Sequence, residues 1–145
     1  MKLAGASEAV PLYEDDFALW AESQAAFLRD RRFELLDIPN LFDEIASMAG
    51  HQRHELRSRL VVLLAHLLKA AYQPERMGKS WRATIRLQRR EIGSVLMDSP
   101  SLRRELPAML AYAYPHAVAE AVDETGLPKQ TFPADCPYTL EEVLG

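Results

Sequence analysis

The sequence predicts an all-α fold, a single-domain helical bundle of about four or five helices around a long central helix, with an irregular C-terminal tail. Apolar residues recur with a period near 3.6 along almost the whole chain, and no segment shows the alternation of a half-buried strand. Pro74, Pro100 and Gly126 fall between periodic segments. The 145 residues, 48% of them hydrophobic, suffice for one core. We therefore expect one domain over residues 1–145, with 1–12 flexible and 127–145 an extended tail packing on the bundle.

The first helix is expected at about residues 14–30. The acidic run Glu14-Asp15-Asp16 is typical of a helix N-terminus, where carboxylates interact favourably with the helix dipole. The residues that follow at helical spacing are Phe17, Trp20, Gln24, Phe27 and Leu28.

The central helix is predicted over residues 39–73. Pro39 is tolerated in a first helical turn, and Pro74 ends the helix because it disfavours α geometry at Gln73. The sequence leaves open whether this helix is continuous through Gly50. Apolar side chains lie on several of its sides, which is typical of a helix that others surround. The main stripe is Leu56, Leu60, Leu63, Leu67 and Ala71.

Later segments carry their own start and stop signals. Ser80 is expected to cap a helix over 81–98, whose outer face is basic. Gly126 suits the position just past a helix C-terminus. Thr139 and Glu142 have the spacing of a capping box for one final turn.

Charge is distributed unevenly along the chain. The net charge is −4, yet residues 51–104 hold twelve Lys and Arg against four Asp and Glu, whereas the remainder holds five against seventeen. The basic middle could attract an anionic partner, or the acidic ends could fold against it. A pI near 5.6 disfavours a dedicated nucleic-acid-binding domain.

Composition favours a cytoplasmic protein without a membrane partner. The longest apolar run, Leu60 to Ala65, is far shorter than the roughly 20 residues of a membrane-spanning helix. The first residues lack the apolar core of a secretory signal. The single cysteine, Cys136, can form no disulfide within the chain, which agrees with a reducing compartment.

The predicted helix over 81–98 carries a stripe of guanidiniums. Arg82, Arg86, Arg89 and Arg90 share one helical face, and each guanidinium can donate two parallel hydrogen bonds to a phosphate or carboxylate. These residues are candidates for binding a ligand or partner, with nucleic acid possible but not favoured. The alternative is a solvated face, or one paired with the acidic first helix.

Arg59 and His66 are the candidates for catalysis. Seven residues apart, they lie within about 20° of each other around a helix. The spacing resembles the Arg-x(4–6)-His motif of the helical-bundle ribonucleases of the higher-eukaryote-and-prokaryote nucleotide-binding superfamily, where the His transfers protons and the Arg contacts the phosphate. The alternative is a core histidine that is hydrogen-bonded within the bundle.

A metal site is the third possibility considered. His51, His54 and Glu55 are spaced as ligands on one helix face. Three or four convergent ligands are needed, and the sequence does not supply a complete set here. We therefore expect no metal and no cofactor.

The break after the central helix predicts a corner between two antiparallel helices. Trp81 opens the second helix, and its indole N–H needs a partner if the ring is buried, for which Gln73 and His66 are candidates. Trp81 and Gln73 are accordingly candidates for contact with a ligand. We expect this junction to be a structural corner, and the alternative is a ligand-binding pocket.

Five stretches together resemble a bacterial family known as domain of unknown function number twenty-nine. They cover about residues 13–144 and read "YEDDFALWAESQAAFLRDRRFELLD", "HLLKAAYQP", "SWRATIRLQRREI", "DSPSL" and "ETGLPKQTFPADCPYTLEEVL". The resemblance implies a helical bundle from a cytoplasmic bacterial protein. It implies no activity and no site residues, because the family has none assigned.

The function expected from these observations is a non-enzymatic protein-interaction or accessory module, with an unknown protein partner and an oligomer possible. The alternative is an RNA-acting enzyme or nucleic-acid-binding protein that uses Arg59 and His66 with the basic face of helix 81–98.

Overall fold

The structure, a computed structural model, describes residues 12–145 and is all-α, as the sequence predicts. Within that range it contains five α-helices, four short 3-10 turns and no strand. The chain divides into two compact units, Met1–Ala49 and Gly50–Gly145, here called the N-terminal unit and the C-terminal unit. The single domain expected over residues 1–145 stays a prediction. The flexible stretch expected at 1–12 lies, apart from Leu12, outside the described residues.

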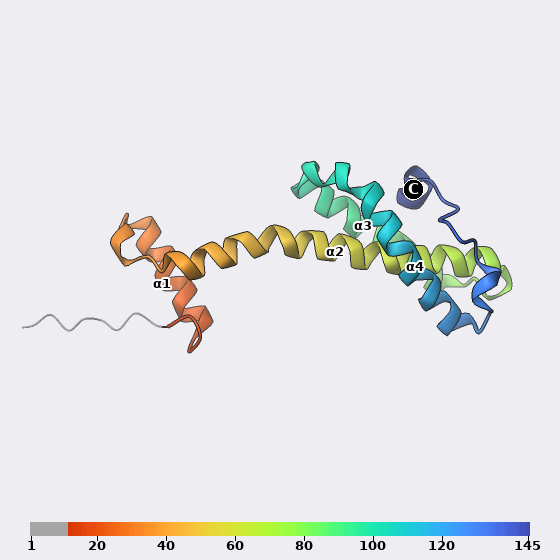
Figure 1. Cartoon of the computed structure of the whole chain (residues 1–145), viewed down its shortest axis with the longest axis horizontal. Helices are drawn as coiled ribbons and strands as arrows, with labels where there is room; N and C mark the ends of the chain where they lie inside the picture. Colours follow the sequence, from red (N-terminus) through yellow and green to blue (C-terminus); the bar gives the residue numbers. More distant parts are fainter. Residues whose placement is uncertain (1–11) are drawn as a thin grey trace, which may run out of the picture. The chain divides into compact units, whose positions relative to one another are not determined.

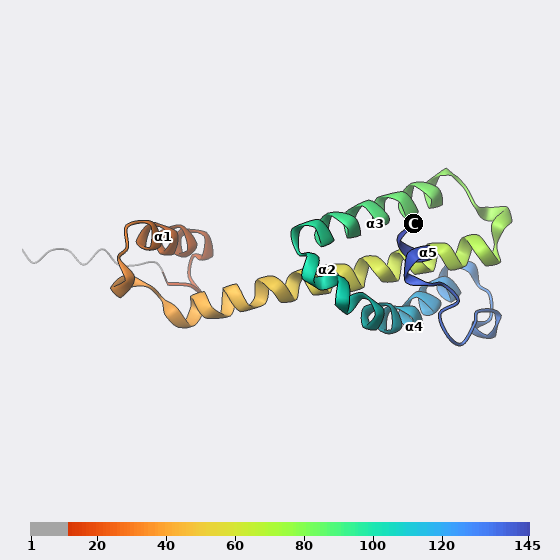
Figure 2. The same ribbon diagram turned by 90° about the horizontal axis from the view of Figure 1, so that it is seen from above.

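In the N-terminal unit, the short 3-10 turn η1 (Phe33–Leu35) connects α1 (Phe17–Arg29) to the start of α2 (Ile38–Tyr72) (Figure 2). Helix α1 begins three residues later than predicted, because Asp16 is its N-cap and accepts a hydrogen bond from the backbone N of Leu19 at 3.0 Å. Trp20 is buried, and its Nε1 donates to Asp37 Oδ2 at 3.0 Å. Hydrogen bonds from Asn40 and then Trp20 lower the pKa of Asp37, which therefore stays ionised as an acceptor.

The predicted central helix is α2 (Ile38–Tyr72), and it runs without interruption through Gly50. A single glycine costs a helix about 1 kcal/mol relative to alanine, too little to break one with so many helix-forming neighbours. The helix ends just before Gln73, which has φ −135° and ψ 60°, outside the α region that Pro74 disfavours. Residues 38–49 of α2 belong to the N-terminal unit and residues 50–72 to the C-terminal unit.

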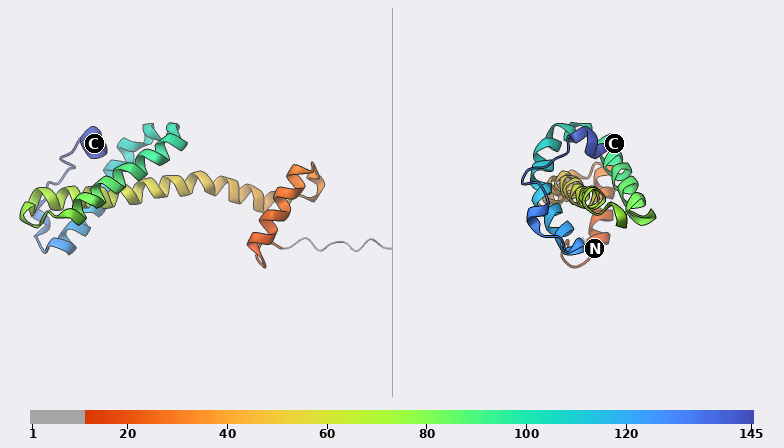
Figure 3. Two further views of the ribbon diagram at one scale, coloured as in Figure 1. Left: turned by 180° about the vertical axis from the view of Figure 1, so that it is seen from behind. Right: turned by 90° about the vertical axis from the view of Figure 1, so that its right-hand side faces the viewer.

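In the C-terminal unit, α3 (Lys79–Asp98) and α4 (Leu106–Thr125) lie along different sides of α2, as the view along the helix shows (Figure 3). A six-residue 3-10 segment, η3 (Pro100–Glu105), joins them. The short helix α5 (Leu140–Leu144) packs against both (Figure 1). The second half of α2 therefore has neighbours on several sides, as its apolar pattern predicts.

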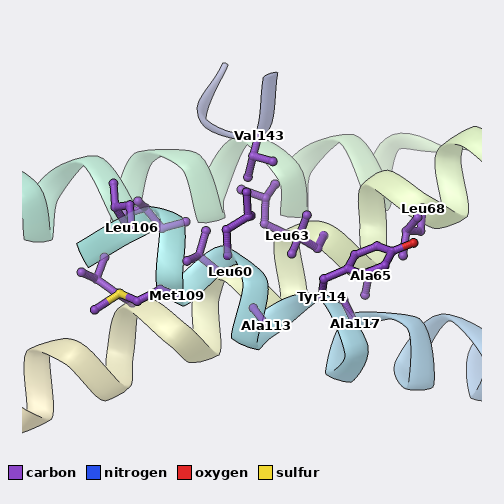
Figure 4. Packing of buried hydrophobic residues seen from close by; sticks show 14 of the residues in the cluster. Leu60, Leu63, Ala65, Leu68, Leu106, Met109, Ala113, Tyr114, Ala117 and Val143 are labelled. Atoms are coloured by element: carbon purple, nitrogen blue, oxygen red, sulfur yellow. The ribbon is translucent and has the colours of Figure 1, made fainter. Parts of the chain in front are cut away.

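The core of the C-terminal unit is built on α2. Side chains from α4 and α5 converge on it (Figure 4). The fully buried large side chains of α2 are Leu56, Leu60, Leu63, Leu64 and Leu68. Opposing them from the other elements are Ile92, Leu106, Met109, Ala113, Ala117, Phe132 and Val143, among others.

Two boundary predictions are confirmed and one is wrong. Gly126 follows α4 in the left-handed conformation at φ 72°, and Thr139 and Glu142 form the reciprocal capping box of α5. Ser80 does not cap α3: the helix starts at Lys79, and Gly78 is the N-cap. The reason is the extended backbone of Gly78, which follows the turn at Pro74–Arg76 and lets the chain enter the helix two residues early.

Within residues 12–145, none of the helices combines the length and apolar content that a membrane crossing requires.

The burial pattern makes a direct prediction for stability. Leu63→Ala is expected to lower the free energy of unfolding by about 2–5 kcal/mol, because it removes a fully buried side chain and leaves a cavity. Arg86→Ala, at an exposed position on α3, is expected to stay within about 0.5 kcal/mol. Denaturant unfolding measures both, and equal losses would contradict this assignment of the buried and exposed faces.

Candidate functional site

Several residues singled out on α2 line one surface pocket of the C-terminal unit. The pocket has a volume of about 530 Å³ and includes Gln88 of α3. Its lining is His51, His54, Glu55, Ser58, Arg59, Val62 and Gln88. The structure thus brings the catalytic candidate Arg59 together with the three residues considered as metal ligands.

The guanidinium of Arg59 is already occupied by groups of the chain itself. Its Nε donates to Glu55 Oε1 at 2.9 Å, and its Nη1 donates to Gln88 Oε1 at 3.2 Å. Its Nη2 lies 3.9 Å from Glu91 Oε2. Because Gln88 and Glu91 belong to α3, Arg59 acts as a polar link between two helices.

His66 does not line this pocket. Its Nδ1 lies 2.8 Å from the backbone carbonyl of Val62, and because a carbonyl only accepts, Nδ1 carries the proton in this contact. Seven residues along a helix also separate His66 from Arg59 by about 10 Å in height. The angular match seen in the sequence therefore leaves the two side chains in different contacts.

His51 and His54 are exposed on α2, and Glu55 is the acceptor for Arg59. Within residues 12–145, no three His, Cys, Asp or Glu side chains are placed to hold a metal ion. The pair of histidines thus forms part of a pocket rim.

A second pocket, of about 370 Å³, brings α2 and α4 together, and sequence analysis missed it. It shares His54, Ser58 and Val62 with the first pocket, and Tyr112, His116 and Glu120 of α4 also line it. The rings of Tyr112 and His116 lie 4.9 Å apart between centroids. The spacing of His116 and Glu120 on one helix face was the available signal, but their approach to α2 depends on tertiary packing.

The four arginines of α3 do not act as one face. Arg89 turns towards α5, where its Nε and Nη2 each donate at 3.0 Å to backbone carbonyls, those of Val143 and Glu142. A cation at the C-terminus of a short helix satisfies carbonyls that lack helical partners. Arg82, Arg86 and Arg90 are exposed. The outer basic face therefore consists of three guanidiniums.

At the corner after α2, a buried lysine replaces the predicted contacts of Trp81. The side chain of Lys69 is 3% exposed, donates to Glu124 of α4, and places Nζ 4.9 Å from the centroid of the Trp81 ring. Gln73 instead accepts from Arg76, at 3.4 Å. A cation over an indole face is a favourable arrangement. Lys69 thus joins α2, α3 and α4.

The C-terminal tail is attached to the core by tyrosines. Tyr114 Oη donates to the backbone carbonyl of Pro133 at 2.6 Å, and Tyr138 Oη donates to that of Leu67 at 3.2 Å. Burial, with Cys136 nearby, raises the pKa of Tyr114 to about 12, so its phenol remains a donor at neutral pH. Cys136 itself is half-buried and within 3.6 Å of the Tyr138 carbonyl.

A large group of exposed apolar side chains lies in the N-terminal unit. On α2, Ile38, Phe42, Ile45 and Met48, here called the α2 stripe, are 59%, 69%, 65% and 64% exposed. Steps of four, three and three residues place them on one side of the helix. The contact given for α1 is the hydrogen bond from Trp20 to Asp37, the residue before α2. These four side chains recur at helical spacing, but the N-terminal unit does not bury them.

The contact between Lys69 and Glu124 predicts different losses of unfolding free energy for two substitutions. Glu124→Ala is expected to lower the free energy of unfolding by about 1–3 kcal/mol, because it leaves a buried ammonium without its acceptor. Lys69→Met removes the charge and keeps the volume, so its effect should stay below about 1.5 kcal/mol. Chemical denaturation compares them, and a larger loss for Lys69→Met would contradict this assignment.

Comparison with known proteins identifies the family. No curated protein and no solved structure matches the chain. A family model described as "Domain of unknown function DUF29" matches residues 12–145, which is the whole range that the structure describes. The chain therefore belongs to the DUF29 family.

Proposed function

We propose that this chain is a non-enzymatic protein-interaction domain and that its N-terminal unit carries the binding face. The supporting observation is the uneven exposure of large apolar side chains. Of the thirteen exposed among residues 12–145, nine lie within residues 12–49. They are Leu12, Phe17, Leu19, Leu28, Phe33, Ile38, Phe42, Ile45 and Met48. Exposed apolar surface concentrated in this way is typical of an interface.

The charge of the same unit favours a protein partner over nucleic acid or an anionic lipid surface. Residues 12–49 hold nine Asp and Glu against three Arg. Phosphates would be repelled by this excess of carboxylates, whereas an apolar protein surface with a basic rim would be attracted to it. The proposed partner surface is therefore apolar at its centre and basic or neutral around it.

The contacts of the two catalytic candidates also support a non-enzymatic role. The guanidinium of Arg59 is engaged by Glu55 and Gln88, and His66 donates to a backbone carbonyl of its own helix. A ribonuclease needs both groups to converge within hydrogen-bond reach of one phosphate. The RNA-acting alternative would require these contacts to be given up.

The proposal is tested by capture from an extract of the host organism, with the full chain as bait. Proteins bound through the proposed face should be retained by the parent chain and lost with the double variant Phe42→Glu, Ile45→Glu, because two carboxylates would be desolvated at the centre of the apolar contact. Both positions are exposed, so the variant should keep the parent's thermal midpoint and helical circular dichroism.

Met97→Glu is the matched control, because Met97 is 82% exposed on α3 of the C-terminal unit. It should retain the same proteins as the parent chain. An identical set for parent, double variant and control would contradict the proposal. Capture of RNA that Arg86→Ala abolishes and the double variant leaves intact would favour the nucleic-acid alternative instead.

A further inference from the structure

We propose that the surface around Arg57, between α2 and α4 of the C-terminal unit, is a binding site for a small molecule that carries a phosphate monoester. The proposal goes beyond the protein-interaction function and does not depend on it. Three observations carry it: the lack of a partner for Arg57 within the described residues, the hydrogen-bond donors around it, and the two carboxylates that border the site.

Arg57 differs from the other Lys and Arg side chains of the C-terminal unit that are buried or half-buried. Those that bind a group of the chain are Arg53, Arg59, Lys69 and Arg89. Arg57 is half-buried as well, yet no carboxylate or carbonyl within residues 12–145 binds its guanidinium. A partly desolvated cation with unused donors favours an anion from outside the chain.

The guanidinium of Arg57 is positioned by an aromatic ring. It lies over the ring of Tyr112 on α4, 5.8 Å from the centroid, which is a favourable distance for a cation and a π face. The same ring lies 4.9 Å from that of His116 between centroids. Tyr112 therefore holds Arg57 and His116 on one side of α4.

Arg57 and Tyr112 line two neighbouring pockets. One is the pocket of about 370 Å³ between α2 and α4, and the other, of about 480 Å³, also includes Arg104 of η3. Both volumes are within the usual range for small-ligand pockets. The site therefore has room for an anionic group at Arg57 and for the small molecule to which that group is attached.

Further donors in the pocket of 370 Å³ favour a phosphate over a carboxylate. His54 and Ser58 of α2 and His116 of α4 line it together with Arg57. An imidazole N–H and a hydroxyl can each donate one hydrogen bond, and the guanidinium can donate two in parallel. A carboxylate offers two oxygens, which the guanidinium alone would satisfy. A phosphate monoester offers three terminal oxygens and could use the additional donors.

Two carboxylates favour one compact anion over a nucleic acid. Glu120 lines the pocket of 370 Å³, and Glu105, which binds Arg53 at 2.9 Å, lines the other. A nucleic acid binds through a series of phosphate contacts, and here the phosphates next to the one at Arg57 would meet these carboxylates. A single phosphate monoester at Arg57 avoids that repulsion.

The experiment is a titration of the full chain with inorganic phosphate and with glycerol 3-phosphate, followed by NMR at constant pH and ionic strength. The Nε–Hε signal of Arg57 and the ring signals of His54 and His116 should shift and saturate. We expect a dissociation constant on the order of 0.1–10 mM, as for a small anion at an open site. Acetate, the carboxylate probe, should bind more weakly because it has fewer oxygens to accept hydrogen bonds.

Substitutions distinguish the site from the overall charge of the chain. Arg57→Gln should raise the dissociation constant for phosphate roughly tenfold or more, because the paired charge-assisted hydrogen bonds are lost. Arg57→Lys keeps the charge without the planar fork and should have a smaller effect of the same sign. Arg86→Gln is the matched control, because Arg86 is exposed on α3, lines neither pocket and carries the same charge. It should leave the constant unchanged.

Four results would overturn the proposal. The first is the absence of a saturating shift at Arg57 up to about 100 mM phosphate, ten times the weakest constant expected. The second is an equal loss of affinity in Arg57→Gln and Arg86→Gln, which would reflect net charge. The third is acetate binding as tightly as phosphate. The fourth is binding of a short RNA, or of vesicles that contain phosphatidic acid, that requires Arg57 while glycerol 3-phosphate does not bind.

Discussion

Burial of the apolar side chains of α2 is the interaction on which the C-terminal unit depends. Leu56, Leu60, Leu63, Leu64 and Leu68 are 0% exposed, and α3, α4 and α5 are arranged to cover them. The hydrophobic effect rewards any arrangement that removes this area from water, so it does not by itself choose one register. Specific polar contacts select the register. The ammonium of Lys69, the guanidinium of Arg59 and the guanidinium of Arg89 each bind a group on another helix.

The apolar side chains in the first third of α2 should also be stabilised by burial, and this is the basis of the proposed interaction function. These side chains repeat at the helical period, but the N-terminal unit leaves the α2 stripe exposed. Apolar surface of this kind is stabilised by a partner, and the carboxylates around it favour a partner made of protein. The proposed function therefore rests on the apolar side chains that the N-terminal unit leaves exposed. The candidate catalytic side chains, Arg59 and His66, are engaged in contacts within the chain.

Sequence reasoning predicted what depends on local pattern. The class, the long α2, the glycine after α4 and the capping box of α5 all follow from periodicity and turn chemistry over a few residues. It could not predict the partner of Lys69, because Glu124 lies 55 residues away and their pairing depends on how α2 and α4 pack. It could not place Arg59 and His66 relative to each other, because a helical projection shows angle and omits height, and the two side chains make different contacts. The role of Arg89 likewise required the position of α5.

Hydrogen exchange of the backbone amides along α2 in the purified chain tests the central claim most directly. Amides of residues 56–71 should exchange slowest, because only global unfolding exposes them. Amides of residues 38–49 should exchange faster, because the apolar side chains of this segment stay exposed in the isolated chain. Equal protection of both segments would contradict the claim that the first third of this helix lacks its partner.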